Sequence, residues 1–366
     1  MIRSLPGVVV SLARSAVLPL AAIVAAFAVS AILIVLAGVN PLDAYAAMIQ
    51  GSVGSPASLA VTGVRMTPIL LTGLAVAISF RAGVFNIGAE GQLYLGAAAA
   101  AAVALVPLGI PGILHIILAL LAGFVGGALW ILVPAYLRAY RGVSEVVTTL
   151  MLNFVGILVV SYLVDPTLGP MGERGASFAQ SVPIEDTARL PILAARTSLH
   201  AGLPIGVAIA IALYVLIQYT PFGFRLRMIG ANPTAARFAG VRSARQMVLV
   251  MLLSGGIAGL AGAGEVMGLR HRLFDHFSPG YGYDGIAIAL LAGANPLAVI
   301  VTAGFFGALR AGSSLMQQVT RIETSIVLII QALTILFVIA GLFRGWFRQR
   351  QPELKAPVHS AESADA

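Results

Sequence analysis

The feature that most constrains this chain is a succession of long apolar stretches that contain almost no charge. Residues 15–40 hold no charged side chain, and similar runs recur along the 366 residues, of which 59% are hydrophobic and only 10% charged. A hydrocarbon layer about 30 Å thick is spanned by about 20 apolar residues in a helix, whereas a membrane β-barrel shows short alternating segments. The sequence therefore predicts an all-α polytopic membrane protein.

The apolar runs define about ten expected helices within a transmembrane domain of residues 1–343. The third helix starts within residues 80–97, which read FRAGVFNIGAEGQLYLGA, and ends near Val106. We expect a polar outer loop at 40–58 and a disordered tail at 344–366, which is rich in Pro, Ala, Ser and Glu. The other helices are expected near residues 15–39, 59–80, 112–137, 145–164, 199–219, 247–268, 281–294, 296–312 and 325–343.

The arginines predict the orientation of these helices. Residues 220–246 hold five arginines and no acidic residue, and loops of this kind stay on the cytoplasmic side. The polar residues 165–198 are then expected in the periplasm. Both termini are expected in the cytoplasm, which needs an even number of crossings and counts 281–294 as a short or tilted one. This topology accounts for the formal charge of +8, so membrane lipid and not nucleic acid is the expected neighbour.

A short sequence pattern recurs in the second half of the chain. Residues 88–91 read Gly-Ala-Glu-Gly and residues 282–285 read Gly-Tyr-Asp-Gly, and each pattern opens a segment rich in Ala, Leu and Gly. Five predicted crossings separate the two, so the second copy is inverted. Inverted repeats are typical of transporters, and we expect pseudo-repeats at about 59–164 and 247–343. The alternative is a coincidence in a protein rich in Gly and Ala.

Polar residues within the apolar segments are the candidates for a translocation path or for helix breaks. A carboxylate at membrane depth is costly unless it is paired or hydrated, so Glu90 and Asp284 stand out. Hydration near an interface is the alternative for both. The amides can donate and accept hydrogen bonds along a path, or simply join helices; they are Asn86, Gln92 and Asn153.

Arg65 and Arg310 are expected to snorkel toward an interface rather than to bind anions. The chain has no cysteine, and its five histidines are scattered. We therefore expect no metal and no cofactor, and the pattern contains no nucleophile and base that would indicate an enzyme.

The loop 220–246 contains a predicted short helix that would offer a docking surface. Asn232-Pro233 is a typical helix start, and Gly240 lies near the expected end. The alternative is an ordinary basic loop beside anionic lipid. The residues assigned to the docking loop are Gly230, Asn232, Pro233, Thr234, Ala235, Ala236, Arg237 and Gly240.

The chain lacks a nucleotide site of its own. A phosphate-binding loop needs a Gly-Lys-Ser/Thr sequence, and the only lysine is Lys355, in the tail. If ATP drives transport, a partner must bind it.

Four stretches of the chain resemble the permease subunits of bacterial ABC importers of the branched-chain amino acid, ribose and nucleoside class. The closest similarity is to the nucleoside, or simple sugar, branch. The stretches are FRAGVFNIGAEGQLYLGA (80–97), GVSEVVTTLMLNF (142–154), GANPTAARFAGV (230–241) and GYGYDGIAIALLAGANP (280–296) with the following FFGALRAG.

The resemblance implies a transporter in the bacterial inner membrane, built from several subunits. Two permeases, here expected to be different chains, would enclose the path, two ATP-binding subunits would attach from the cytoplasm, and a periplasmic binding lipoprotein would deliver the solute. The loop 230–240 would be the coupling helix. Its Ala235, Ala236 and Gly240 match the docking motif of the family, while Thr234 stands where many importers have Glu. The alternative function is a proton-coupled secondary transporter that uses Glu90 and Asp284.

Overall fold

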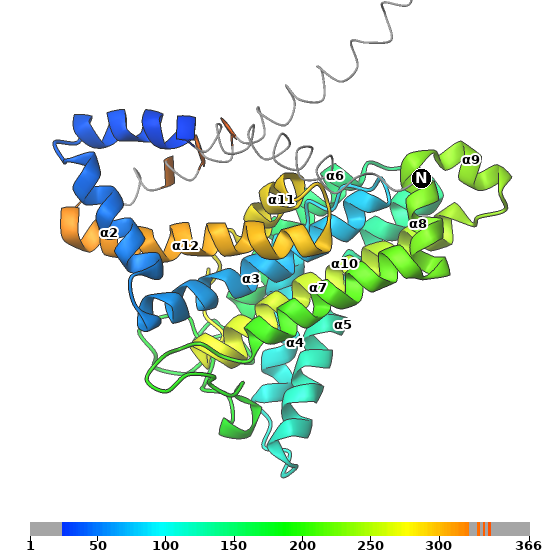
Figure 1. The fold of residues 1–366 in the computed structure, drawn as a ribbon. Helices are drawn as coiled ribbons and strands as arrows, with labels where there is room; N and C mark the ends of the chain where they lie inside the picture. Colours follow the sequence, from blue (N-terminus) through cyan, green and yellow to red (C-terminus); the bar gives the residue numbers. More distant parts are fainter. Residues whose placement is uncertain (1–23, 322–327, 330–331, 334–335, 338–366) are drawn as a thin grey trace, which may run out of the picture. The chain divides into compact units, whose positions relative to one another are not determined.

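A computed structural model of the chain describes residues 24–321, 328–329, 332–333 and 336–337 (Figure 1). The chain divides into two compact units, Tyr45–Val319 and the residues before and after it. In the smaller unit, Val24–Leu36 forms a helix, within the first helix expected from the sequence. The expected tail, and all but short pieces of the expected helix 325–343, lie outside the described residues.

Six helices among the described residues are long and apolar enough to cross a membrane, or up to seven if Val24–Leu36 and α2 (Pro41–Val53) form one interrupted span. Ten crossings are therefore not confirmed. Described residues outside the helices form only isolated β-bridges. The six are α3 (Pro56–Arg81), α5 (Gly112–Arg141), α6 (Glu145–Leu163), α7 (Gly202–Tyr219), α10 with η2 (Ser243–Gly264 and Glu265–Arg270) and α12 (Pro296–Thr320).

Two further apolar helices are too short to span the bilayer. α4 (Ala89–Ala104) has 16 residues and α11 (Tyr281–Leu291) has 11, which at 1.5 Å per residue gives about 24 Å and about 16 Å. A hydrocarbon layer is about 30 Å thick. The prediction of a crossing at 281–294 therefore does not hold for α11 alone.

The polar connections contain more helix than the sequence predicts. The outer loop expected at 40–58 is wrong, because most of it forms α2. Asn40 Oδ1 accepts a hydrogen bond from the Leu42 N–H and so favours the helix start, and Gly51 of α2 packs against Leu315 of α12. Two helices also occupy most of the loop 220–246, namely α8 (Pro221–Ala231) and α9 (Pro233–Phe238). Residues 165–198 contain only the short η1 (Asp186–Ala188).

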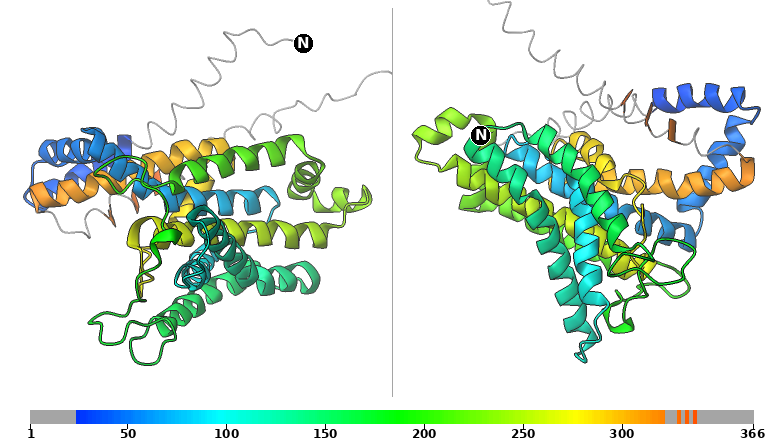
Figure 2. Two further views of the ribbon diagram at one scale, coloured as in Figure 1. Left: turned by 90° about the horizontal axis from the view of Figure 1, so that it is seen from below. Right: turned by 180° about the vertical axis from the view of Figure 1, so that it is seen from behind.

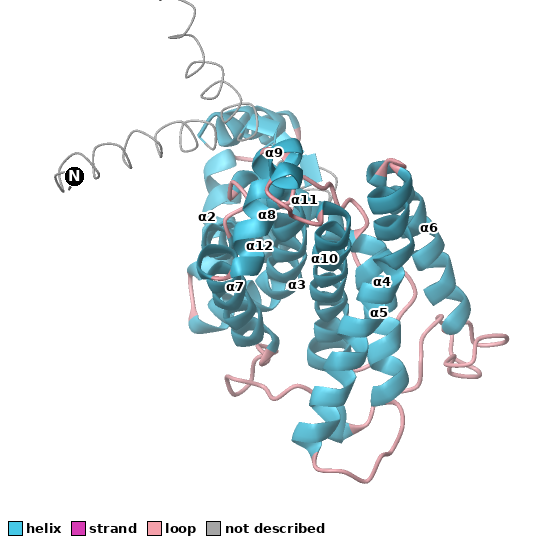
Figure 3. Cartoon of the chain, turned by 90° about the vertical axis from the view of Figure 1, so that its right-hand side faces the viewer, coloured by secondary structure: helices cyan, strands magenta, loops and turns pink. Residues whose placement is uncertain are grey.

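α10 is the central helix of the larger unit and packs against α3, α4 and α5 (Figure 3). Small residues make these contacts. A Cβ atom on Gly96 of α4 would lie 2.2 Å from the Cα of Gly259, and one on Gly259 would lie 2.2 Å from the carbonyl oxygen of Gly123 in α5. Helices in a membrane associate through close backbone packing, because lipid is as apolar as their side chains.

The loops at one end of the helices form an ordered layer. Figure 2 shows α8 and α9 at one end, and the long connection between α6 and α7 at the other. That connection pairs with the segment after η2, since the Ser181 N–H donates to the Leu273 carbonyl and the Ile184 N–H to that of His271. Arg272 forms an ion pair with Glu173 across the same two segments.

We expect Gly259→Ala to destabilise the bundle, because its Cβ would overlap the backbone of α5. Overpacking of this kind costs about 1–3 kcal/mol. Gly264→Ala in the same helix is the matched control, since a Cβ there meets no atom within 4 Å and alanine is a better helix former. Thermal unfolding of the two variants in detergent checks this, and equal midpoints would contradict it.

His200, at the start of α7, makes the stability of the loop layer depend on pH. The ring is 1% exposed, and burial, with neighbouring His271, lowers its pKa to about 4 from the usual 6.5. Between pH 6.5 and pH 4 the histidine is protonated in the unfolded chain but not in the folded chain, which favours unfolding. The contribution of His200 to stability is therefore complete above pH 6.5 and is lost as the pH falls toward 4.

We therefore expect wild-type protein to lose more stability than His200→Asn between pH 7 and pH 4.5. Asparagine cannot titrate, but its side-chain oxygen can replace the Nδ1 atom that accepts a hydrogen bond from the Gly202 N–H. Thermal midpoints measured at both pH values check this. An equal loss in both proteins would show that His200 is not the group that titrates.

Candidate functional site

Both short helices begin inside the bundle. α3 ends at Arg81, and residues 82–88 then run without helical structure to the start of α4. Asn86 in this segment is fully buried and donates to Ser254, which lies near the middle of α10. Residues 271–280 lead in the same way from η2 to the start of α11. The N-termini of α4 and α11 therefore meet within the protein, which we call the helix junction.

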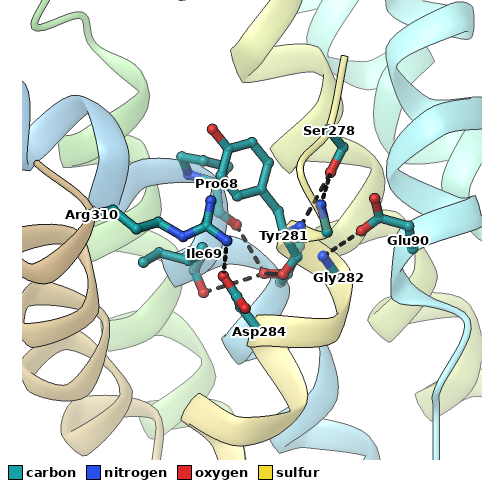
Figure 4. Close-up of polar contacts among 10 residues, drawn as sticks. Pro68, Ile69, Glu90, Ser278, Tyr281, Gly282, Asp284 and Arg310 are labelled. Atoms are coloured by element: carbon teal, nitrogen blue, oxygen red, sulfur yellow. Dashed lines mark hydrogen bonds and ion pairs between the residues drawn. The ribbon is translucent and has the colours of Figure 1, made fainter. Parts of the chain in front are cut away.

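Glu90 of α4 joins the two helices at the junction (Figure 4). Its Oε2 atom accepts a hydrogen bond of 2.6 Å from the N–H of Gly282, in the first turn of α11. A Cβ on Gly282 would lie 2.2 Å from the Glu90 nitrogen, so only glycine permits this approach. The first N–H groups of a helix have no partner within it, and its dipole favours a negative charge there. Glu90 thus supplies an N-terminal cap for another helix.

The start of α11 is also held from its other side. Figure 4 shows Arg310 of α12 and Glu90 of α4 approaching α11 from opposite directions. Arg310 forms an ion pair with Asp284, and its guanidinium carbon lies 5.1 Å from the centre of the Tyr281 ring. Thr72 of α3 donates to the Tyr281 carbonyl at 2.9 Å.

Three buried amides hold the segment 82–88. Asn86 and Gln92 exchange two hydrogen bonds of 2.9 Å each. Asn153, near the middle of α6, accepts from the Gly91 N–H at 2.8 Å and donates to the Ile87 carbonyl at 2.9 Å. Backbone that is not helical is tolerated at membrane depth only where protein satisfies its polar groups. Asn86 and Asn153 do so here, and Gln92 holds the Asn86 side chain in place.

The structure brings all the polar candidates from the sequence to this junction: Asn86, Glu90, Gln92, Asn153 and Asp284. Their part in transport remains a prediction. The two acidic residues differ in their contacts. Glu90 caps α11, but Asp284 does not cap α4, because the Gly88 N–H donates to Asn86 Oδ1 instead.

The expectation that Arg310 snorkels toward an interface is wrong. Its side chain is only 13% exposed and is paired with Asp284, so it does not snorkel to an interface. An arginine in an apolar run needs an acidic partner, but the sequence does not say which one, because Asp284 lies 26 residues away. Ser254 and Thr72 carried no such signal, since single hydroxyl groups are common in membrane helices.

α9 forms at the predicted place at the end of the bundle. Asn232 Oδ1 accepts from the N–H groups of Thr234 and Ala235 at 3.0 Å each, and Pro233 is the first helical residue. Gly240, just after the helix, has a φ of 79°. Phe238 is 88% exposed, an unusual state for a large apolar side chain.

The end that carries α9 is rich in arginine. A groove between the ends of α3, α5 and α10 contains Arg138, Arg237, Arg242 and Arg245. Only Arg138 of these four pairs with a described carboxylate, that of Glu145. α8 contacts α3 closely here, since a Cβ on Gly230 would lie 2.2 Å from the Arg81 carbonyl oxygen. Within the part of the chain that the structure describes, no three His, Asp or Glu side chains are grouped to hold a metal ion.

Long apolar helices, buried half-length helices and a short exposed helix at one end define a multi-pass membrane transport protein. Residues 57–339 match the model of a family described as the branched-chain amino acid transport system / permease component, and the chain belongs to this family. It is thus a permease component of an ABC transporter and not an enzyme. No solved structure matches the chain.

Curated relatives cover most of the chain. It is 39% identical to the glucose ABC transporter permease protein TsgB13 of Haloferax volcanii, over 89% of this chain and 87% of the relative. It is 34% identical to the guanosine ABC transporter permease protein NupP of Bacillus subtilis (87% and 92%). It is 30% identical to the nucleoside ABC transporter permease protein NupB of Lactococcus lactis (89% and 91%). Membership in an ABC permease family implies ATP-binding and substrate-binding partners, and no observation favours the proton-coupled alternative.

We expect Glu90→Gln to preserve the helix junction and Glu90→Ala to weaken it. The amide oxygen of Gln can still accept from the Gly282 N–H, whereas Ala leaves this buried donor unpaired at a cost of about 1–2 kcal/mol. Thermal stability of the purified variants checks this. If Gln and Ala destabilise equally, the negative charge, and not the capping hydrogen bond, is what the junction requires.

Proposed function

We propose that this chain forms half of the translocation path of an ATP-driven importer for nucleosides or related simple sugars. The observation that carries the proposal is the similarity over nearly the whole chain to permeases named for guanosine, nucleosides and glucose. These solutes share a polar ring with several hydroxyl groups. The polar helix junction is compatible with a path for such solutes.

The helix junction supports an inverted repeat. In this proposal α3 and α4 correspond to α10 and α11, so the two half-length helices occupy matching places in the two halves. Their N-termini meet at Glu90 and Gly282, and interrupted helices at matching positions are typical of such transporters. The proposed repeats remain about 59–164 and 247–343.

The arginines support an orientation in which α9 lies in the cytoplasm. Arg81, Arg138 and Arg237 gather at that end, and basic residues favour the cytoplasmic side. The ordered layer that includes 165–198 is then periplasmic. We place the chain in a bacterial inner membrane, with both termini in the cytoplasm and with lipid around the helices.

We infer that α9 is the coupling helix that docks on an ATP-binding subunit. Its support is the exposed aromatic ring of Phe238, because buried aromatic anchors contribute most to interfaces. To the docking loop expected from the sequence we add Phe238. That loop comprises Gly230, Asn232, Pro233, Thr234, Ala235, Ala236, Arg237 and Gly240. A second permease, which we propose to be a different chain, and a periplasmic binding lipoprotein complete the importer.

The test is uptake of labelled guanosine and glucose by cells that express the chain with its ATP-binding and solute-binding partners. We expect uptake of at least one solute that stops when ATP is depleted. Phe238→Ala should abolish it and release the ATP-binding subunit during purification, because the interface loses its apolar anchor. Uptake that continues without ATP and follows a proton gradient would overturn the proposal.

Phe224→Ala on α8 is the matched control for this experiment. Phe224 is the same residue type and is 56% exposed, but it lies outside α9. We expect this variant to retain the subunit and uptake. If both variants lose the subunit equally, α9 is not the specific docking element.

A further inference from the structure

We propose that the solute passes along a polar seam between α3 and α12, and that Arg310 contacts the solute there. The polar seam consists of Ser58, Thr62 and Arg65 of α3 and Arg310, Ser314 and Gln317 of α12. This inference rests on the proposed transport function and names the surface and the chemistry that would serve it.

α12 has one polar face. Arg310, Ser314 and Gln317 are spaced by four and three residues, which places them on the same side of a helix, and all three are half-buried. Val319 lies on the opposite side and is 59% exposed. In a membrane helix the apolar face suits lipid, whereas a polar face needs protein, water or solute.

α3 carries a matching polar face. Ser58, Thr62 and Arg65 are spaced by four and three residues and are also half-buried. The two helices meet where Gly307 of α12 approaches Met66, since a Cβ on that glycine would lie 2.9 Å from the Met66 Cβ. Arg65 is the neighbour of Met66, and Arg310 follows Gly307 by one turn. Both arginines therefore lie beside the crossing point.

Both faces extend from this crossing toward the end opposite α9. Arg81 at the end of α3 donates to the Ala294 carbonyl at 2.8 Å, just before α12 begins, so the two helices run antiparallel. Ser58 and Gln317 are then nearest the loop layer, and the arginines lie deeper. In the proposed orientation the polar seam leads inward from the periplasmic side.

Charged groups at the deep end of the seam are balanced but not fully hydrogen-bonded. Arg310 pairs with Asp284. Glu265 forms an ion pair with Arg270 at 4.0 Å and interacts electrostatically with Arg65 and Arg310. Glu265 is 2% exposed and begins the π-helical turn η2, a feature that is frequent at functional sites. Its Oε2 atom and the Nε atom of Arg310 are buried without a hydrogen-bond partner.

The chemistry of these groups selects the kind of solute. An unpaired buried donor and an unpaired buried acceptor suit a molecule that both accepts and donates hydrogen bonds, as hydroxyl groups do. Three arginines (Arg65, Arg270 and Arg310) interact here with three carboxylates (Glu90, Glu265 and Asp284). Their formal charges balance, so a charged solute would find no unpaired counter-ion. The seam therefore fits a neutral, hydroxyl-rich solute, such as a nucleoside or a sugar, and disfavours a phosphorylated one.

The accessibility of single cysteines tests the seam directly, because the chain has no cysteine of its own. The complex with its partners would carry Ser314→Cys, Gln317→Cys or the control Val319→Cys, and a membrane-impermeant thiol reagent would be added from the periplasmic side. Val319 is closer than Ser314 to the end of α12, so depth alone predicts faster labelling at Val319. We expect the reverse, with labelling of S314C slowed by excess solute. Faster labelling of V319C than of S314C would overturn the proposal.

A second experiment separates solute contact from a purely structural ion pair between α11 and α12. The double variant Asp284→Asn with Arg310→Gln replaces the pair by amides, which can still hydrogen-bond each other. We expect this complex to assemble and to hydrolyse ATP, but to take up solute with a KM raised roughly 10-fold or more, because a charged donor is lost. An unchanged KM would overturn the contact with Arg310.

Outcomes for the seam and for the proposed function can be told apart. Labelling of S314C that is faster than that of V319C supports a water-accessible seam whether or not guanosine or glucose is transported. Absence of uptake of both solutes by the wild-type complex would overturn the proposed solute class. Uptake by the wild type together with slow labelling of S314C would overturn the seam alone.

Discussion

The structure depends on satisfying backbone polar groups where no water is available. Residues 82–88 leave the helical pattern beside buried helices, and their N–H and carbonyl groups need partners there. Residues 271–280 instead belong to the loop layer and lead back to the start of α11. Asn86, Asn153 and Glu145 provide partners for the first segment, and Glu90 provides one for the helix that follows the second. The polar residues of 80–97 thus permit α4 and α11 to begin against other helices of the bundle. The structural role of Glu90 as a cap for α11 is sufficient to explain a charged residue at this depth, without a role in transport.

The helices around this junction differ in how they are packed. α10 contacts α4 and α5 through glycines at backbone distance, which leaves no flexible side chain between them. α3, α11 and α12 combine such glycine contacts, Gly285 on Thr72 and Gly307 on Met66, with an ion pair, an arginine over an aromatic ring and a hydroxyl group. Close small-residue contacts favour a single arrangement, whereas polar contacts can exchange partners. The region around α10 is therefore held mainly by close packing, and the α3 and α12 side by close packing together with polar contacts.

The sequence predicted the features that depend on local signals. Long apolar runs identified the spanning helices. Asn232-Pro233 and Gly240 identified α9, because the signals that start and end a helix lie in the residues at its two ends. A repeated pattern of four residues singled out Glu90 and Asp284, but it did not predict that the helices carrying them meet. Tertiary contacts decided the rest. α2 was missed because its glycine and serine residues read as a loop, although Gly51 packs on α12. α11 was taken for a crossing because hydropathy does not reveal that a helix begins within the protein. The partner of Arg310 lies 26 residues away in the sequence, beyond any local pattern.

The contact between Gly230 and Arg81 has a mechanical consequence. The α-carbon of Gly230 meets the carbonyl group of Arg81 without an intervening side chain, and the Arg81 guanidinium in turn holds the carbonyl of Ala294. A displacement of α9 by a bound partner would reach the end of α3 through this backbone contact. It would reach the start of α12 through the hydrogen bond from Arg81 to Ala294. A side chain at position 230 would separate the two backbones. By changing its rotamer it would reduce the displacement that α8 passes to α3. Because Gly230 has no side chain, a displacement at the basic end of the protein is passed directly to α3 and so to the interior.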